Sequence, residues 1–442
     1  MTARGRDPGA GDPAVSDPAP GDLAAGDPTA GDPVALVLAG GGARGAYEAG
    51  ALSVLLPVLE ERGQRPRILI GASVGALNAA FLASTAQLPI DEITAAALEI
   101  WEAIGWRQVA RGLVSPASLL RLGEYAGEVL GVPRARIDSL LDPEPLRASL
   151  RARIDFPRIE RNVREGHLDA VAVVATSAST GRSVVFHSGL ASPPVDVRRR
   201  IDYVSVRLTE DHVLASAAIP ILFPAVHVVA PEGAQGWYMD GGTRLDTPVK
   251  PALAFGAGRV VVVALNSPAI DPRPPAGSAG SEDGGARPDA LAGAAQVLVG
   301  LLEDQLAADV QTLATINRLA GPGTGKRQVP YILIAPAEPN AIAQRALDVV
   351  RTHYSGPTAA VRAPDLALLA RLTGGGRDVH HAELLSFLLF APEFARALVR
   401  LGQEDARRWL AERHDGDDLW QLGPTPPPPG PPPPPTAPDA AS

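Results

Sequence analysis

Short apolar runs recur along the chain, and longer segments rich in Ala and Leu separate most of them. The runs are four to seven residues long and rich in Val, Ile and Leu. Such runs are typical of strands that are buried on both faces of a sheet. We expect these strands at residues 34–39, 67–70, 171–175, 184–187, 259–265 and 331–334.

The segments between the runs predict helices. Residues 45–59 and 74–84 follow the first two runs. Further helices are expected at residues 291–319, 341–352, 364–372 and 381–411, the last with a break near Pro392. Strands joined through helices favour parallel pairing. The pattern therefore predicts an α/β fold with a central, mostly parallel sheet covered by helices, followed by a C-terminal helical extension.

Both ends of the chain have the composition of disordered tails. Residues 1–33 repeat an Asp every five residues, and residues 424–438 are almost entirely Pro, which favours polyproline II. The expected division is a Gly-Asp-Pro tail at 1–33, the α/β domain at 34–345, the helical extension at 346–415 and a Pro-rich tail at 416–442. The Pro-rich tail is a candidate docking segment for a protein partner, and residues 268–288 are expected to form a loop.

Composition and charge exclude several classes of protein. Hydrophobic residues make up 46% of the chain and charged residues 20%, an ordinary balance for a globular protein. The net charge is −9, so no general attraction to nucleic acid is expected. The chain has no Cys, which excludes disulfides, a thiol nucleophile and cysteine metal sites.

Two features of the sequence concern localisation. The N-terminus lacks the apolar core of a secretory signal. Residues 68–90 carry no charge and are long enough to span a bilayer, but Gly, Asn, Gln and Pro interrupt them. A buried strand, a tight turn and a buried helix explain this stretch better. We expect a cytoplasmic protein, or one that is peripheral to a membrane.

One serine stands in a motif typical of a nucleophile. The run Gly71-Ala72-Ser73-Val74-Gly75 lies between an expected strand and an expected helix. In that position a G-x-S-x-G motif forms a strained turn that presents the serine, and the glycines let neighbouring backbone pass closely. The start of the helix also favours negative charge. Ser73 is the predicted nucleophile, and a plain turn serine is the alternative.

The first expected strand leads into a second glycine-rich run, Gly40-Gly41-Gly42-Ala43-Arg44-Gly45. Glycine permits a backbone whose N–H groups converge on one point, as an oxyanion hole requires. The same run matches G-x-G-x-x-G, so a dinucleotide site is an alternative, although no carboxylate ends the next strand to bind a ribose. Arg44 would anchor the loop or meet a lipid phosphate, and a structural salt bridge is the third interpretation.

The best-placed base is Asp240, in the run Asp240-Gly241-Gly242. The glycines form a turn that presents a short side chain. Desolvation by Trp237, Tyr238 and Phe223 would raise the pKa of this carboxyl toward the working range of a base. An ordinary Asp-Gly turn is the alternative for this motif taken alone.

None of the eight histidines stands in an obvious triad context. An α/β-hydrolase uses Ser, then Asp or Glu, then His in chain order. His353, His380 and His381 satisfy that order, but each lies in a polar segment typical of surface histidines.

The three motifs, in this order, resemble the patatin-like phospholipase family over most of residues 34–270. The run from Ala215 to Pro224 and the segment Asp246-Thr247-Pro248-Val249 belong to the resemblance, although the family usually has Asn where Asp246 stands. The resemblance implies a patatin-like three-layer fold and a catalytic dyad of Ser73 and Asp240. It assigns Gly40, Gly41, Gly42 and Arg44 to the oxyanion loop. The other glycines of the motifs, which support their backbone conformation, are Gly45, Gly71, Gly75, Gly241 and Gly242.

The function implied by the resemblance is serine-dependent hydrolysis of carboxylic esters in phospholipids or related lipids, of the phospholipase A or lysophospholipase type. It implies an acyl-enzyme intermediate, no cofactor and no metal, so activity is expected to be independent of calcium. The implied partners are a lipid ester and a transient contact with a membrane surface. The alternatives are a dinucleotide-binding oxidoreductase and a catalytically silent module that binds lipid or a protein partner.

Two further groups of residues concern substrate access. Trp101 and Trp106 would form an interfacial lip if they were exposed, although aromatics at helical spacing are more typical of a core. Arg198, Arg199 and Arg200 would meet anionic headgroups, although a solvated run of charge is the simpler interpretation.

Overall fold

The computed structural model describes residues 32–111, 141–245, 248–267, 327–355, 363–366, 379–413 and 418–423, with 313–315, 317, 318 and 320. Most of both expected tails, the loop expected at 268–288 and most of the helix expected at 291–319 lie outside the described residues. The same holds for Asp246 and for most of the helix expected at 364–372.

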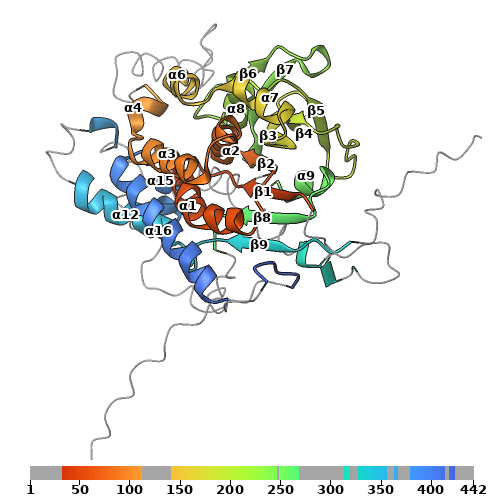
Figure 1. Ribbon diagram of the computed structural model, residues 1–442. Coiled ribbons are helices and arrows are strands. Elements are labelled where there is room, and N and C mark those ends of the chain that lie inside the picture. The colour runs from red at the N-terminus through yellow and green to blue at the C-terminus, as the bar shows by residue number, and fades with distance from the viewer. Residues whose placement is uncertain are drawn as a thin grey trace, which may run out of the picture.

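The centre of the fold is a nine-stranded sheet, as far as the described residues show. Seven strands follow the order β5-β4-β3-β2-β1-β8-β9, while β7 pairs with β3 and β6 pairs with β7 (Figure 1). The strands are β1 (Val34–Leu38), β2 (Ile68–Ala72), β3 (Ala170–Ser177), β4 (Ser183–Gly189), β5 (Ile201–Ser205), β6 (Val226–Val228), β7 (Gly236–Asp240), β8 (Arg259–Val263) and β9 (Tyr331–Ile334).

Most strand pairs are parallel, as predicted. β1 pairs in parallel with β2 and β8, and the pairs β2–β3, β8–β9 and β4–β5 are parallel too. The antiparallel pairs are β3–β4, β3–β7 and β6–β7. β4 reverses direction because a short turn, rather than a helix, joins it to β3.

All six expected strands form, with ends that differ by a few residues, but β5, β6 and β7 were not predicted. β6 is three residues long, and β5 and β7 mix buried and partly exposed positions. Such strands have no continuous apolar run for a sequence pattern to detect.

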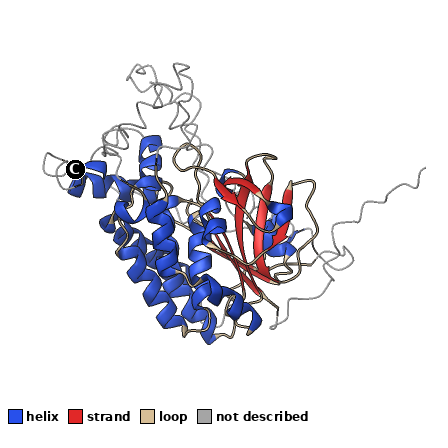
Figure 2. Cartoon of the chain, turned by 90° about the horizontal axis from the view of Figure 1, so that it is seen from above, coloured by secondary structure: helices blue, strands red, loops and turns tan. Residues whose placement is uncertain are grey.

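Most helices lie on one side of this sheet, and short helices lie on the other side (Figure 2). They are α1 (Gly45–Glu61), α2 (Val74–Thr85), α3 (Ile90–Glu102), α4 (Trp106–Val109), α6 (Glu144–Arg153), α7 (Phe156–Arg164), α8 (Glu210–Ser216), α9 (Val249–Ala254), α12 (Ala341–Val349), α15 (Val379–Leu388) and α16 (Pro392–Ala411). Short turns of other helix types are η1 (Gly42–Arg44), η2 (Glu232–Ala234), η3 (Gly241–Thr243) and the π-helical η4 (Val350–Tyr354).

Two apolar cores lie on the two faces of the sheet, because successive side chains of a strand point to opposite faces. Leu36 and Leu38 of β1 belong to the core shared with α1, α2 and α16. Ala35 and Val37 belong to the core shared with α9. The predicted α/β fold, with a mostly parallel sheet between layers of helices, is confirmed.

The C-terminal helices pack directly on the first helix of the domain. A Cβ atom on Gly50 of α1 would lie 2.2 Å from the carbonyl oxygen of Val399 in α16, and one on Gly402 would lie 2.2 Å from that of Tyr47. Glycines therefore let the two backbones approach closely. The expected break near Pro392 is confirmed, since α15 ends at Leu388 and α16 begins at Pro392.

The boundary expected at 345/346 falls inside α12, which continues across it. Residues of α15 and α16 share one apolar core with α1 and β1. The helices beyond the boundary therefore complete the layer that covers the sheet.

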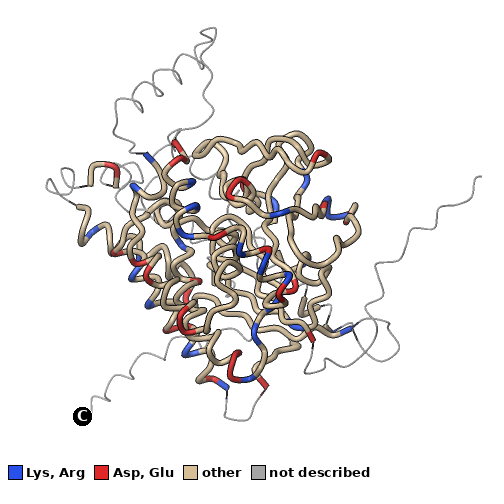
Figure 3. The backbone as a smooth tube through the Cα atoms, turned by 45° about the horizontal axis from the view of Figure 1, so that its top comes forward, with Lys and Arg blue, Asp and Glu red and all other residues tan. Residues whose placement is uncertain are grey.

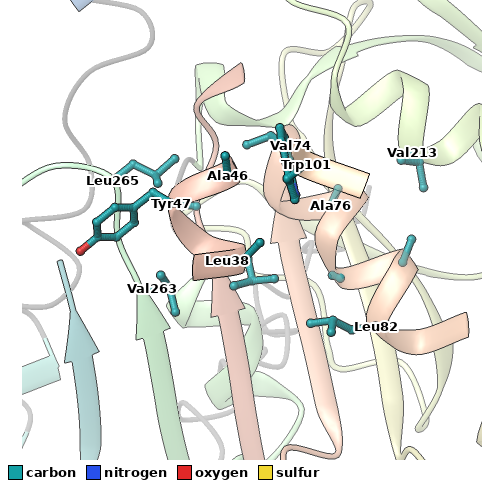
Figure 4. Packing of buried hydrophobic residues seen from close by; sticks show 14 of the residues in the cluster. Leu38, Ala46, Tyr47, Val74, Ala76, Leu82, Trp101, Val213, Val263 and Leu265 are labelled. Carbon is teal, nitrogen blue, oxygen red and sulfur yellow. The ribbon is translucent and has the colours of Figure 1, made fainter. Parts of the chain in front are cut away.

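Trp101 and Trp106 are core residues, with only 5% and 7% of their surface exposed. Trp101 packs beside Val74 at the start of α2 (Figure 4), and its indole N–H donates to Asn78 Oδ1 at 2.9 Å. The interfacial lip is therefore wrong, and the interpretation as core aromatics is confirmed.

The uncharged stretch at 68–90 forms the buried strand β2, a turn and the helix α2, as predicted. Among the helices that the structure describes, none combines the length and apolar character that crossing a membrane requires.

Charged residues of both signs are interspersed over the described elements (Figure 3). The run from Arg198 to Arg200 is exposed in the turn before β5. Arg199 lies 3.7 Å from Asp196, and Arg200 donates to the carbonyl oxygen of Thr180 at 2.7 Å. This exposure and these local contacts favour the interpretation of the run as solvated surface charge.

Candidate active site

β2 and β7 occupy successive positions along one edge of β3. The β2 pairing ends with Ala72 opposite Val174, and the β7 pairing has Asp240 opposite Ala175. Because β2 runs parallel to β3 and β7 runs antiparallel, the carboxyl ends of β2 and β7 meet. This arrangement brings Ser73, which follows β2, next to Asp240, which ends β7.

Ser73 lies on a strained turn between β2 and α2. Its backbone has φ 50° and ψ −122°, a conformation that a residue with a side chain seldom adopts. Its Oγ donates to Asp240 Oδ2 at 2.7 Å. A Cβ atom on Gly75 would lie 2.4 Å from the carbonyl oxygen of Leu38, so only glycine fits there. The strained turn predicted from the motif is confirmed.

Ser216, at the end of α8, holds this turn in place. Its hydroxyl accepts from the Ser73 backbone N–H at 2.9 Å and donates to the carbonyl oxygen of Val174 at 2.5 Å. The side chain is fully buried. Ser216 lies in the run from Ala215 to Pro224, which is part of the family resemblance, but the sequence suggested no role for its side chain.

Asp240 is completely buried, and each of its oxygens has a partner. Oδ1 accepts from the backbone N–H of Gly242 at 2.7 Å, while Oδ2 accepts from Ser73. Burial raises the pKa of the carboxyl to about 7, although the hydrogen bonds from Ser73, Gly242 and Thr243 oppose the increase. The predicted direction of this pKa shift is confirmed.

Trp237 does not contribute to that burial, contrary to the prediction. It is 58% exposed and stacks against His227, with a distance of 4.9 Å between the ring centroids. The alternation along β7 turns Trp237 to the face opposite Asp240. Tyr238 and Phe223 are buried, as expected.

The glycine-rich loop leaves the sheet beside Ser73, since Leu38 of β1 pairs with Gly71 of β2. Gly40, Gly41 and Gly42 are buried. Within the described part of the chain, the amides of Gly41 and Gly42 have no hydrogen-bond acceptor. Donors of this kind are what an oxyanion hole requires.

Arg44 anchors this loop and has only 1% of its surface exposed. Its guanidinium bonds to Asn266, Glu383 and Ser386, and its backbone N–H donates to the carbonyl oxygen of Gly41 at 3.1 Å. The Arg44 side chain therefore has no surface on which to meet a lipid phosphate. The backbone N–H of Arg44 is likewise used inside the turn, where it donates to Gly41.

The remaining glycines of the motifs lie around the same point. Gly71 is in β2, Gly45 begins α1 against Val74 and Trp101, and Gly241 and Gly242 begin η3. A Cβ atom on Gly241 would lie 2.1 Å from the carbonyl oxygen of Val174. All three motifs therefore converge on the carboxyl ends of β1, β2 and β7.

Histidines take no part in the site as far as their side chains are described. His353 lies in η4, and the side chains of His380 and His381 fall outside the described residues. The described hydrogen bonds of the Ser73 and Asp240 side chains join the two side chains to each other and Asp240 to the backbone amide of Gly242.

Comparison with known proteins identifies the family. Residues 36–253 match the family model described as patatin-like phospholipase, a segment that contains Ser73, Asp240 and the glycine-rich loop. No curated protein matches the chain. Among solved structures, the crystal structure of VipD from Legionella pneumophila matches over 86% of this chain and 67% of that chain, with 13% identity and a TM-score of 0.30. Through residues 36–253, the chain belongs to the patatin-like phospholipase family of lipid acyl hydrolases.

Proposed function

We propose that the chain is a serine hydrolase that cleaves carboxylic esters of phospholipids or related lipids, as a phospholipase A or lysophospholipase, through a dyad of Ser73 and Asp240. The observation that carries this proposal is the 2.7 Å hydrogen bond from Ser73 Oγ to the buried carboxyl of Asp240. A carboxyl whose pKa is about 7 can accept a proton near neutral pH. Membership of the family supports a lipid ester as the substrate.

The first half of the reaction forms an acyl-enzyme. Ser73 Oγ attacks the carbonyl carbon of the ester while Asp240 Oδ2 takes the hydroxyl proton. The carbonyl oxygen becomes an oxyanion, which the amides of Gly41 and Gly42 and the N-terminal end of α2 stabilise. The C–O bond to the alcohol then breaks, and Asp240 gives its proton to the departing oxygen.

The second half releases the fatty acid. Asp240 takes a proton from water while the water oxygen attacks the acyl carbon. The same amides stabilise the second oxyanion. The bond from the acyl carbon to Ser73 Oγ breaks, and Oγ recovers the proton from Asp240. This sequence restores both residues and requires no metal or cofactor.

The arrangement of Asp240 suits this proton transfer. Its Oδ1 accepts from the Gly242 amide at 2.7 Å, which directs Oδ2 toward Ser73. The carboxyl has no exposed surface, so water does not compete for Oδ2. A base held in this way needs no histidine between it and the serine.

Labelling with a fluorophosphonate probe tests the proposal. Wild type should be labelled, Ser73→Ala should not, and Asp240→Asn should be labelled more slowly. Ser84→Ala is the matched control, because Ser84 lies in α2, the helix that follows Ser73, and, like Ser73, is 4% exposed. Labelling that survives Ser73→Ala would contradict the dyad. A wild-type protein that binds lipid vesicles without labelling or ester turnover would favour the silent module.

A further inference from the structure

α15 lies outside the segment that matches the family model, yet it contacts the glycine-rich loop. A Cβ atom on Gly42 would lie 2.3 Å from the carbonyl oxygen of Phe387 and 3.3 Å from its carbonyl carbon. The backbone of α15 therefore packs against the backbone of the loop. Gly42 has φ +57°, so glycine is favoured there by conformation as well.

Arg44 connects this helix to the loop through several bonds. Its Nε donates to Ser386 Oγ at 2.8 Å, and one terminal nitrogen donates to both the carboxylate and the carbonyl oxygen of Glu383. The other terminal nitrogen donates to Asn266 Oδ1 at 3.1 Å, just beyond β8. The guanidinium carbon also lies 3.7 Å from the centroid of the Phe387 ring.

The side chains of Arg44, Glu383 and Ser386 are buried and bond to one another. Glu383 is 7% exposed, and Arg44 and Ser386 are almost completely buried. Ser386 Oγ accepts from Arg44 and donates to the carbonyl oxygen of Glu383 at 2.6 Å. Charge-assisted hydrogen bonds in a medium of low dielectric constant are strong and directional, so they hold the guanidinium in one position.

We propose that Glu383 and Ser386 are positioning residues for the oxyanion loop, a role that rests on the proposed function. The backbone N–H of Arg44 donates to the carbonyl oxygen of Gly41, so displacement of Arg44 displaces the turn that carries the Gly41 and Gly42 amides. Stabilisation of an oxyanion depends on the placement of its donors within a fraction of an ångström. The helix α15 thus positions the oxyanion loop.

Steady-state kinetics on p-nitrophenyl butyrate, with Glu383→Gln and Ser386→Ala, test this role. In both variants kcat should fall by about 10- to 100-fold while KM stays within about twofold, because only the transition state loses its donors. Ser386→Ala removes one neutral hydroxyl, so it keeps the test decisive if Glu383→Gln does not fold.

The control is Asp405→Asn. Asp405 is also buried, and it links α16 to α1 by accepting a hydrogen bond from Tyr47, while it also bonds to Arg408 of its own helix. Its loss should lower the melting temperature but leave kcat unchanged. If Asp405→Asn lowers kcat as much as Glu383→Gln does, a loosened helix layer explains the loss, and the proposal is overturned.

Hydrogen exchange of the peptide that contains residues 39–46 gives a readout independent of turnover. Exchange should rise in Glu383→Gln and Ser386→Ala but not in Asp405→Asn. Unchanged exchange in the first two variants would overturn the positioning role even if activity fell. If wild type neither labels nor turns over ester, the proposed hydrolase fails, and the exchange result still decides whether α15 holds the loop.

Discussion

Ser73 Oγ and Asp240 Oδ2 lie 2.7 Å apart although 167 positions separate the two residues in the sequence. The contact exists because β2 and β7 approach each other end to end along one edge of β3. The nucleophile follows the first of these strands and the base ends the second. The dyad is therefore a consequence of sheet topology as much as of the two motifs.

The pH dependence of hydrolysis should follow the ionisation of Asp240. The carboxyl must be ionised to accept the serine proton, and its pKa is raised to about 7 by burial. We expect kcat/KM to rise with pH, with its midpoint near pH 7, and to level off above it. Measurement of kcat/KM from about pH 5 to about pH 9 tests this. A flat profile down to about pH 5 would contradict a base of this pKa.

Asp240 should also make the fold less stable as pH rises. Its pKa is about 7 in the native state and 3.8 when unperturbed, so the native state retains the proton longer than the unfolded state. The stability that this provides is fully present below about pH 4 and is lost as the pH rises through about 7. The difference of about three pH units corresponds to about 4 kcal/mol.

Urea denaturation of wild type and Asp240→Asn at about pH 4 and about pH 8 measures this effect. The stability of the variant relative to wild type should increase by up to about 4 kcal/mol between the two pH values, because Asn does not ionise. A relative stability that is the same at both values would mean that Asp240 titrates normally in the folded protein.

Ser216→Ala should weaken the turn that presents Ser73. The change leaves the Ser73 amide without its acceptor and the Val174 carbonyl without its donor, both in a buried place. We expect a loss of about 1–3 kcal/mol in unfolding free energy and a fall of about 10-fold in the rate of fluorophosphonate labelling.

Ser84→Ala is the comparison for this variant, because among the described residues the Ser84 hydroxyl bonds only to a carbonyl oxygen of its own helix, that of Phe81. Its labelling rate should equal that of wild type. If Ser216→Ala also labels at the wild-type rate, the hydrogen bond to the Ser73 amide has no role in presenting the serine.

Gly42→Ala should be far more harmful than Gly63→Ala. Both glycines have positive φ, 57° and 67°, but a Cβ atom on Gly63 meets nothing within 4 Å. Gly63→Ala should therefore lower the unfolding free energy by only about 1 kcal/mol, the cost of a positive φ for a residue with a Cβ atom. Gly42→Ala must also displace the Phe387 carbonyl, which adds about 1–3 kcal/mol, and labelling should be lost. Equal melting temperatures for the two variants would show that α15 moves aside without cost.

Hydrolysis should be insensitive to removal of calcium, because the proton transfers and the oxyanion stabilisation use only Ser73, Asp240 and backbone amides. Turnover of a phospholipid by enzyme dialysed against EDTA should equal that of the untreated enzyme. Activity that is abolished by the chelator and restored by calcium would contradict this mechanism.

The sequence alone determined the features that depend on neighbouring residues. The glycines around Ser73 predict the strained turn, because only residues without a Cβ atom fit against the backbone there. The apolar runs predict the buried strands, and their separation by helices predicts mostly parallel pairing. Pro392 marks the break between α15 and α16, because proline favours the first turn of a helix.

Only the tertiary structure decided the features that depend on contacts between distant segments. The alternation of β7 turned Trp237 outward, and the shared edge of β3 brought Asp240 to Ser73. The bonds of Arg44 to Glu383 span 339 positions, and no local pattern marks Glu383 or Ser386 as partners of the glycine-rich loop. Local motifs specify backbone conformation, whereas the burial, the raised pKa of Asp240 and the anchoring of the loop arise only when the sheet and the C-terminal helices pack together.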